Sequence, residues 1–258
     1  MEKMINYGID LGTTNSAIAK FVKGEVIVFN NPLDYGRATL PSVVCYQKDK
    51  IIVGSQAKVM FGKQKKDSFT QAFFKRKMGT SESFQIKSQN RSITPIELSA
   101  QVLKELKTFV NTGDTLESVV ITIPASFDLI QSNATKEAGY QAGFKQVVLL
   151  QEPIAASLAY ANMKKSKGLT DGQWLVYDFG GGTFDAALVK AEEGILAVRD
   201  TDGDNWLGGK NLDEAIVDQI IIPNLQKNFA IESVLADSEK KEILRNAVKF
   251  YAEEAKIQ

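Results

Sequence analysis

The sequence predicts an α/β protein built as two lobes, and two observations carry this prediction. First, a strand-like apolar run twice ends in Asp-x-Gly and a small, hydroxyl-rich turn, once as IDLGTTNS (Ile9–Ser16) and once as YDFGGGTFD (Tyr177–Asp185). Second, strand-like and helix-like runs alternate between these two phrases, which favours a mainly parallel sheet with helices packed on it. The repeated phrase therefore indicates an internal duplication at the level of the fold.

The region up to residue 53 is expected to form strands joined by turns at Lys23-Gly24 and Asp49-Lys50. These strands are Ile5–Ile9, Ala17–Phe21, Val26–Phe29, Val43–Tyr46 and Ile51–Val53. Residues 56–78 are then rich in lysine and arginine and contain one acid, so we expect them to form a solvated helical face. Residues 80–92 are polar and turn-rich.

A helix is expected to open at Pro95. Thr94 can cap it, proline suits the first helical position, and Glu97 completes a capping box. Further strands are expected at Val119–Ile123, Gln146–Leu150, Gln173–Asp178, Phe184–Ala191 and Gly194–Thr201. Further helices are expected at Asp128–Ala142, Pro153–Met163, Leu212–Asn228 and Ser238–Lys256, with a linker at Lys164–Gly172.

Composition excludes several classes of chemistry. The 258 residues include no histidine, which rules out His-ligated metals and Ser-His-Asp triads, so proton transfer falls to carboxylate, lysine, hydroxyl or water. Acidic and basic residues balance at 31 each, which argues neither for nor against a nucleic-acid partner. The single cysteine, Cys45, lies in an apolar run and is expected to be a buried structural thiol. The strand close to the N-terminus leaves no room for a signal peptide, and no apolar run approaches about 20 residues. We therefore expect a cytoplasmic protein.

The two loops have the chemistry of a phosphate site. Glycine and threonine let backbone N–H groups approach a phosphate closely, and an aspartate at the strand end suits a hydrated magnesium ion. The first loop alone could be a plain hairpin turn. The second loop has three consecutive glycines, Gly180–Gly182, whose cost in folding entropy some gain must offset. Two such loops facing each other would grip a nucleoside triphosphate from both sides.

The chain resembles the nucleotide-binding domain of DnaK-type heat-shock chaperones. The motifs that carry the resemblance follow one another in order: IDLGTTNS, FKRKMG, ITIPASF, QEPIAASLAYA, YDFGGGTFD and GDNWLGGKNLD. The match runs from Ile5 to Lys256 and implies a two-lobed actin-like ATPase fold, with ribonuclease H-like lobes that each hold a mixed sheet flanked by helices. It implies lobe I at residues 1–168, with an outer subdomain at about 38–94, and an incomplete lobe II at 169–258.

The resemblance also implies roles for individual residues. Those that match the family's catalytic residues are Lys75, Glu152, Asp178 and Thr183. Those that match its nucleotide-binding residues are Gly12, Thr13, Thr14, Asn15, Gly180, Gly181, Gly182, Thr183, Gly208, Gly209, Glu253 and Lys256. Those that match its cation-site carboxylates are Asp10, Asp178 and Asp185. Without the resemblance, Lys75 reads as an exposed lysine, Glu152 as a helix-start carboxylate, and Glu253 with Lys256 as an i,i+3 pair.

The implied ligands are ATP or ADP with Mg²⁺ and K⁺, and the implied reaction is in-line attack of water on the γ-phosphate. In a full-length form, the implied partners are client polypeptides, a J-domain co-chaperone and a nucleotide exchange factor, with no nucleic acid and no membrane. Pro124 resembles the family's switch proline. Ser126 and Ser132 stand where the family usually has tyrosine and arginine, which puts interdomain coupling in doubt.

The family chain continues beyond residue 258, so we expect a fragment that lacks the rest of the adenine site and the peptide-binding domain. Its lobe II is expected to carry an unpaired strand edge. Three alternatives remain open on sequence alone: an actin-like filament or scaffold protein, a sugar kinase, and a nucleotide-binding fragment without activity.

Overall fold

The computed structural model describes residues 5–32, 34, 36–48, 50–61, 68–113, 115–163 and 171–257. The predicted lobe boundary at 168/169 lies outside these ranges, as do most of the predicted linker, Asp49 of the predicted turn and the lysines between residues 62 and 67. Within the described residues no helix is both long enough and apolar enough to cross a membrane.

The largest sheet is mixed rather than mainly parallel. Its main path runs in the order β11-β10-β1-β2-β3, and β4 pairs with β2 beside this path. Its strands are β1 (Tyr7–Asp10), β2 (Asn15–Val22), β3 (Glu25–Val28), β4 (Leu40–Pro41), β10 (Ser118–Ile123) and β11 (Gln146–Gln151). Only the β1–β10 and β10–β11 pairs are parallel. The prediction of a mainly parallel sheet is wrong because β1, β2 and β3 follow one another through short connections, which join antiparallel neighbours.

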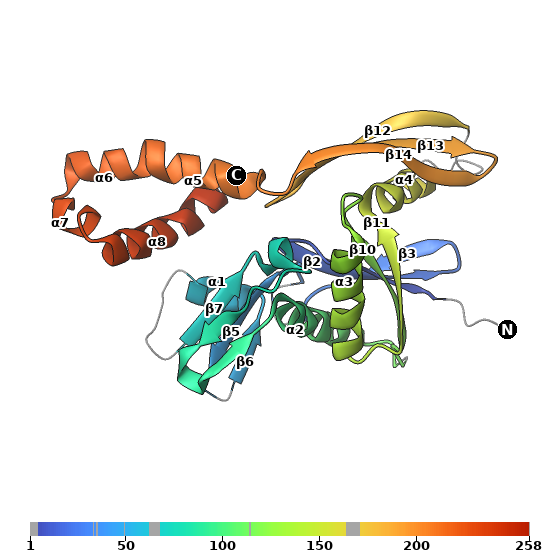
Figure 1. Ribbon diagram of the computed structural model, residues 1–258, viewed down its shortest axis with the longest axis horizontal. Helices are drawn as coiled ribbons and strands as arrows, with labels where there is room; N and C mark the ends of the chain where they lie inside the picture. Colours follow the sequence, from blue (N-terminus) through green and yellow to red (C-terminus); the bar gives the residue numbers. More distant parts are fainter. Residues whose placement is uncertain are drawn as a thin grey trace.

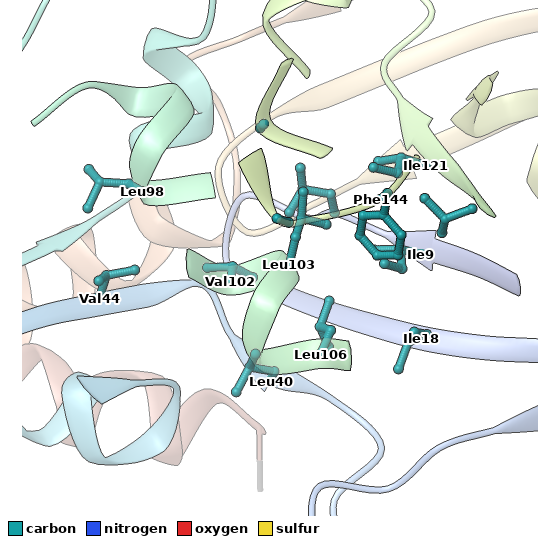
Figure 2. Packing of buried hydrophobic residues seen from close by; sticks show 14 of the residues in the cluster. Ile9, Ile18, Leu40, Val44, Leu98, Val102, Leu103, Leu106, Ile121 and Phe144 are labelled. Atoms are coloured by element: carbon teal, nitrogen blue, oxygen red, sulfur yellow. The ribbon is translucent and has the colours of Figure 1, made fainter. Parts of the chain in front are cut away.

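The main core lies between this sheet and the helices α2 (Pro95–Thr108) and α3 (Leu129–Gln141). The expected capping box at the start of α2 is present, because Thr94 Oγ1 accepts from the Glu97 amide and the Glu97 carboxylate accepts from the Thr94 amide. Asp128 caps α3 in the same way. Figure 2 shows side chains of α2 directed toward those of the sheet strands. The labelled core residues are Ile9, Ile18, Leu40, Val44, Leu98, Val102, Leu103, Leu106, Ile121 and Phe144.

An outer unit follows β4. Its elements are β5 (Val43–Gln47), β6 (Lys50–Val53), α1 (Ser55–Phe61), β7 (Ser68–Ala72), η1 (Phe74–Lys77), β8 (Phe84–Ile86), η2 (Lys87–Gln89) and β9 (Arg91–Ile93). The expected solvated helical face is present in α1, where only Ala57 is buried, but the prediction is wrong from residue 68 on. There the chain forms a strand that pairs with β5 and then a 3₁₀ turn that buries Lys75. Strand β5 pairs with β6 along one edge and with β7 along the other. This long-range pairing cannot be inferred from the lysine content of the segment. Cys45 is fully buried in β5, as predicted.

A second sheet holds the other glycine-rich loop. It is antiparallel throughout, in the order β12-β13-β14, with β12 (Gly172–Phe179), β13 (Phe184–Glu192) and β14 (Ile195–Asp204). Helix α4 (Glu152–Met163) packs on it from the side of β10 and β11, and Trp174 Nε1 donates to Ser157 Oγ of α4 at 2.9 Å (Figure 1). Among the described strands β12 has one neighbour, so its outer edge is open, as expected.

The remaining helices project beyond this sheet and lie above the outer unit (Figure 1). They are α5 (Gly209–Ile216), η3 (Val217–Ile221), α6 (Ile222–Asn228), α7 (Glu232–Leu235) and α8 (Ser238–Ile257). The helix expected over Leu212–Asn228 therefore contains one π-helical turn, in which the Ile222 amide donates to the Val217 carbonyl. Pro223, which lacks an amide proton, follows this turn directly, and a shift in the hydrogen-bond ladder accommodates it.

Candidate functional site

The first glycine-threonine loop joins β1 to β2 and is held by two serines. Ser42 Oγ donates to the Gly12 carbonyl at 2.8 Å, and the Gly12 amide donates to Ser16 Oγ at 3.1 Å. The two hydroxyls lie 2.9 Å apart, and the Ser42 amide donates to the Thr14 carbonyl. This network satisfies several of the loop's own polar groups. Thr14 Oγ1 is buried without a hydrogen-bond partner among the described residues.

The second loop, between β12 and β13, touches the first. A methyl group added at Gly182 would lie 2.7 Å from Thr13 Cγ2, and one added at Gly181 would collide with the Thr14 side chain. Neither position has room for a Cβ atom, so the glycines are needed for the close approach of the two loops. The two loops therefore touch each other, and their service of one nucleotide site stays a prediction.

A third glycine turn, at Gly208 and Gly209, packs against the second loop. The Gly209 amide donates to the Gly180 carbonyl at 3.0 Å, and the Lys210 amide donates to the Gly181 carbonyl at 2.8 Å. The loop also closes on itself, because the Gly180 amide donates to the Thr183 carbonyl at 2.9 Å. The residues matched to the two phosphate loops and the ribose side thus form one contiguous surface.

Lys75 and Glu152 form an ion pair beside these loops. Lys75 Nζ lies 2.8 Å from Glu152 Oε1, and both side chains are largely buried. Lys75 comes from η1 of the outer unit, whereas Glu152 begins α4. The pair places a cation and a carboxylate from distant parts of the chain at one point. The alternative that Lys75 is an exposed lysine is wrong, because only 6% of its surface is accessible.

Two aspartates, Asp178 and Asp185, lie near this pair, and a third, Asp10, lies near Asp178. Asp178 and Asp185 are directly opposite each other on β12 and β13, and Asp10 ends β1, where its carboxylate accepts from Thr122 Oγ1 at 2.9 Å. Burial and the charges of Asp185 and Asp10 raise the pKa of Asp178, against the opposing effect of Lys75. Burial and the charge of Glu152 likewise raise the pKa of Asp185, while a hydrogen bond from Ser126 Oγ lowers it. The site therefore concentrates negative charge that a cation would offset.

A cavity of about 280 Å³ opens beside the loops. Thr13, Thr14, Gly181 and Gly209 contribute to its lining, together with charged and apolar side chains of α1, β7, α5 and α8. Glu253 and Lys256 lie in this lining, as the resemblance implies, but they do not pair with each other. Lys256 Nζ is 2.7 Å from Asp213 Oδ1, and Glu253 Oε2 is 2.7 Å from Lys58 Nζ across the cavity. The Lys58–Glu253 pair joins the outer unit to α8.

The arrangement fits a nucleotide carried with a hydrated divalent cation. The loops offer backbone amides, Thr14 Oγ1 is an orphaned buried hydroxyl, and the carboxylates supply hard oxygen donors. Within the described part of the chain, no three acidic or cysteine side chains converge closely enough to hold a metal directly.

Several residues of the site were missed by sequence reasoning. Ser42, Lys58, Arg76, Thr122 and Asp213 each contact a predicted site residue. Asp213 ends the GDNWLGGKNLD motif, Thr122 lies in ITIPASF and Arg76 lies in FKRKMG, so the motifs contained a signal for these three. Ser42 and Lys58 reach the site only through tertiary contacts, and nothing in the local sequence indicates them.

Comparison with known proteins decides the family. The sequence profile described as "Hsp70 protein" matches residues 6–258, which is nearly the whole chain. The chain belongs to the Hsp70 family. Its fold is accordingly that of the Hsp70 nucleotide-binding domain, an actin-like architecture. The Hsp70 assignment does not favour an independent filament protein or a sugar kinase.

Curated members of the Hsp70 family resemble the chain throughout its length. "Chaperone protein DnaK" of Ureaplasma urealyticum serovar 10 is 40% identical over 260 residues, which cover 100% of this chain and 41% of that protein. The DnaK of Thermosipho africanus is 39% identical over 97% of the chain and 40% of its own length, and that of Mycoplasma mobile is 42% identical over 85% and 35%. The chain thus spans about two fifths of the length of these Hsp70 relatives.

Proposed function

We propose that this chain is the ATP-binding and ATP-hydrolysing part of a DnaK-type chaperone. The observation that carries the proposal is the contact between the two glycine-threonine loops beside the Lys75–Glu152 pair. The loops come from two different sheets, so a nucleotide bound between them holds both parts of the chain. Membership of a family of named chaperones supports the same function.

The chain's own groups are suited to phosphoryl transfer, which needs mostly positioning and neutralisation of charge. The loops Gly12–Asn15 and Gly180–Thr183 would bind the phosphates through backbone amides other than those of Gly12 and Gly180, which donate within their own loops. Gly208 and Gly209 would adjoin the ribose. Bound Mg²⁺, with K⁺ beside it, would neutralise charge on the phosphate oxygens. Asp10, Asp178 and Asp185 would hold these cations through water. Lys75 and Glu152 would orient the attacking water, and Glu253 and Lys256 would bind the adenosine.

We further propose a division into lobe I (residues 1–168), with an outer subdomain at about 38–94, and lobe II (169–258). The separate sheets on either side of residues 164–170 support this division. In a longer protein, hydrolysis would drive cycles of client binding that a J-domain co-chaperone and an exchange factor regulate. The serines at 126 and 132 would weaken the coupling between nucleotide state and client binding.

Single-turnover hydrolysis of ATP by the wild-type chain and a Lys75→Ala variant tests the proposal. We expect the variant to lose hydrolysis and to retain most of its nucleotide affinity, because Lys75 acts on the water and the γ-phosphate rather than on the whole ligand. Lys145→Ala, which removes an exposed lysine paired with Glu117, is the control. Hydrolysis at the wild-type rate in Lys75→Ala would sink the proposed role of the lysine.

A second measurement addresses the partial length of the chain. We expect ATP to bind more weakly to residues 1–258 than to a C-terminally extended chain, with most of the loss from the base. Calorimetry on both chains measures this difference, and equal affinities would refute it.

A further inference from the structure

Arg76 connects the two halves of the proposed site without belonging to either loop. It follows Lys75 in η1, and its guanidinium Nη2 donates to the Gly182 carbonyl of the second loop. A methyl group added at Gly182 would lie 2.8 and 2.9 Å from Arg76 Nε and Nη2. The arginine therefore packs directly against the loop backbone, and the missing side chain of Gly182 makes room for it.

Two aromatic rings, one from each part of the chain, flank this guanidinium. The Arg76 guanidinium carbon lies 6.0 Å from the centre of the Phe73 ring and 5.7 Å from that of Trp206. Both distances lie within the range of cation–π attraction. Phe73 precedes η1, whereas Trp206 lies in the turn between β14 and α5, so the contacts cross from the N-terminal to the C-terminal part.

Trp206 is a large aromatic residue at an exposed position. Its surface is 56% exposed, and its ring also lies 5.0 Å from Lys77 Nζ, so two cations of η1 face it. Its amide donates to Asp204 Oδ1 at 2.7 Å, which fixes the turn that carries the ring. Because the Trp206 ring is largely exposed, its burial contributes little to stability. Its cation–π contacts with Arg76 and Lys77 are therefore the interactions by which it can hold the two units together.

Phe73 has a related feature. Its backbone φ of 58° lies in the left-handed region, where a bulky residue is a genuine outlier. Such strain persists only where surrounding contacts hold it, and it is concentrated at functional sites. The Phe73 ring contacts Lys210 at 4.7 Å as well as Arg76, and Lys210 follows the third glycine turn. Phe73 thus contacts both the N-terminal part of the chain, through Arg76, and the C-terminal part, through Lys210.

We propose that Arg76, Phe73 and Trp206 form an arginine bracket that fixes the second phosphate loop relative to Lys75. The bracket rests on the proposed function and deepens it: Arg76 is a positioning residue, and Trp206 is the closing contact between the two parts. Because Lys75 and Arg76 are adjacent in one 3₁₀ turn, the bond from Arg76 to the Gly182 carbonyl sets where the lysine stands relative to the phosphate loop. Burial lowers the pKa of Arg76, with Glu214 and Asp204 opposing, as expected for a guanidinium packed between groups.

The bracket makes a kinetic prediction. Arg76→Lys keeps the charge but loses the planar fork, so single-turnover hydrolysis falls by about tenfold or more, while the affinity for MgATP changes less. Trp206→Ala releases ADP about two to five times faster, and Trp206→Phe, which keeps a ring, stays near wild type. A merely structural role would instead change stability without this separation of rate from affinity.

A second readout needs no nucleotide. The chain has two tryptophans, so a Trp174→Phe background leaves Trp206 as the fluorescent reporter. Removal of Arg76 exposes the ring, and acrylamide quenching of Trp206 rises in Arg76→Ala but not in Arg91→Ala, whose arginine faces Tyr46. Circular dichroism establishes that each variant is folded. If Arg76→Ala does not fold, Trp206→Ala against Trp206→Phe decides through ADP release.

Unchanged quenching in a folded Arg76→Ala protein, or wild-type hydrolysis in Arg76→Lys, overturns the bracket. If the wild-type chain itself fails to hydrolyse ATP, the proposed function fails, and the quenching comparison still decides whether the bracket exists. The two failures are therefore distinguishable.

Discussion

Replacement of Gly208 by alanine should separate the third glycine turn from the second glycine-rich loop, Gly180–Thr183. A Cβ at this position would lie 2.6 Å from the Gly182 amide nitrogen, 2.7 Å from Gly182 Cα and 2.8 Å from the Gly180 carbonyl oxygen. All three neighbours are backbone atoms of one loop, so no flexible side chain can turn aside. The backbone angle φ at Gly208 is 177°, an extended value open to any residue, so the whole effect comes from this contact.

The size of the effect follows from these distances. Ordinary contact begins at 3.4 Å, so the loop must retreat by 0.6 Å (3.4 − 2.8) to 0.8 Å (3.4 − 2.6). Overpacking of this kind costs about 1–3 kcal/mol, and a displacement of about 1 Å at a catalytic site can cost about 100-fold in rate. The retreat also strains the two hydrogen bonds from Gly209 and Lys210 to the loop carbonyls. We therefore expect the affinity for MgATP and the rate of hydrolysis each to fall by about 10- to 100-fold.

Titration calorimetry and single-turnover hydrolysis measure these two quantities. Gly8→Ala is the matched control, because a Cβ at Gly8 meets nothing within 4 Å and lies in the same sheet as the first loop. The reasoning is refuted if Gly208→Ala binds and hydrolyses MgATP as the wild type does. A fall of equal size in Gly8→Ala would show that the contact at Gly208 is not the cause.

Two further predictions concern charge. In the nucleotide-free protein, Asp185→Asn should raise the melting temperature at pH 7, because burial raises the pKa of this carboxyl and its charge is then a cost to the folded state. The folded protein binds this proton more tightly than the unfolded chain does, so the penalty is complete above the raised pKa. The penalty shrinks as the pH falls toward the ordinary carboxyl pKa near 3.8. A melting temperature of Asp185→Asn below that of the wild type at pH 7 would contradict this prediction. Lys58→Ala should speed ADP release by up to about fivefold and make it less dependent on salt, because it removes a partly exposed ion pair across the cavity. Stopped-flow release of a fluorescent ADP measures this, with Lys145→Ala as control, and an unchanged rate would exclude the pair as a closing contact.

The family and the fold class were predictable from the order of the short motifs. Glycine-rich turns and capping residues act on the backbone within a few residues, so a short stretch of sequence is enough to identify them. The Thr94–Glu97 capping box and the placement of most strands and helices were predictable for the same reason. Local pattern was misleading between residues 68 and 78, where lysine content indicated a continued solvated helix. Pairing of β7 with β5 is a long-range contact, and it decides the structure there.

The repeated Asp-x-Gly phrase by itself determined that the chain has two glycine-rich loops, each following a strand, and which residues form them. Only the tertiary structure decided that they touch, that Lys75 is buried against Glu152, and that Lys256 pairs with Asp213 rather than with Glu253. The contact between Arg76 and Trp206 was likewise decided only by the tertiary structure. Side chains about 130 residues apart in the chain meet only because two sheets and their helices pack together, and the strength of a charge contact depends on that packing and on the water it excludes.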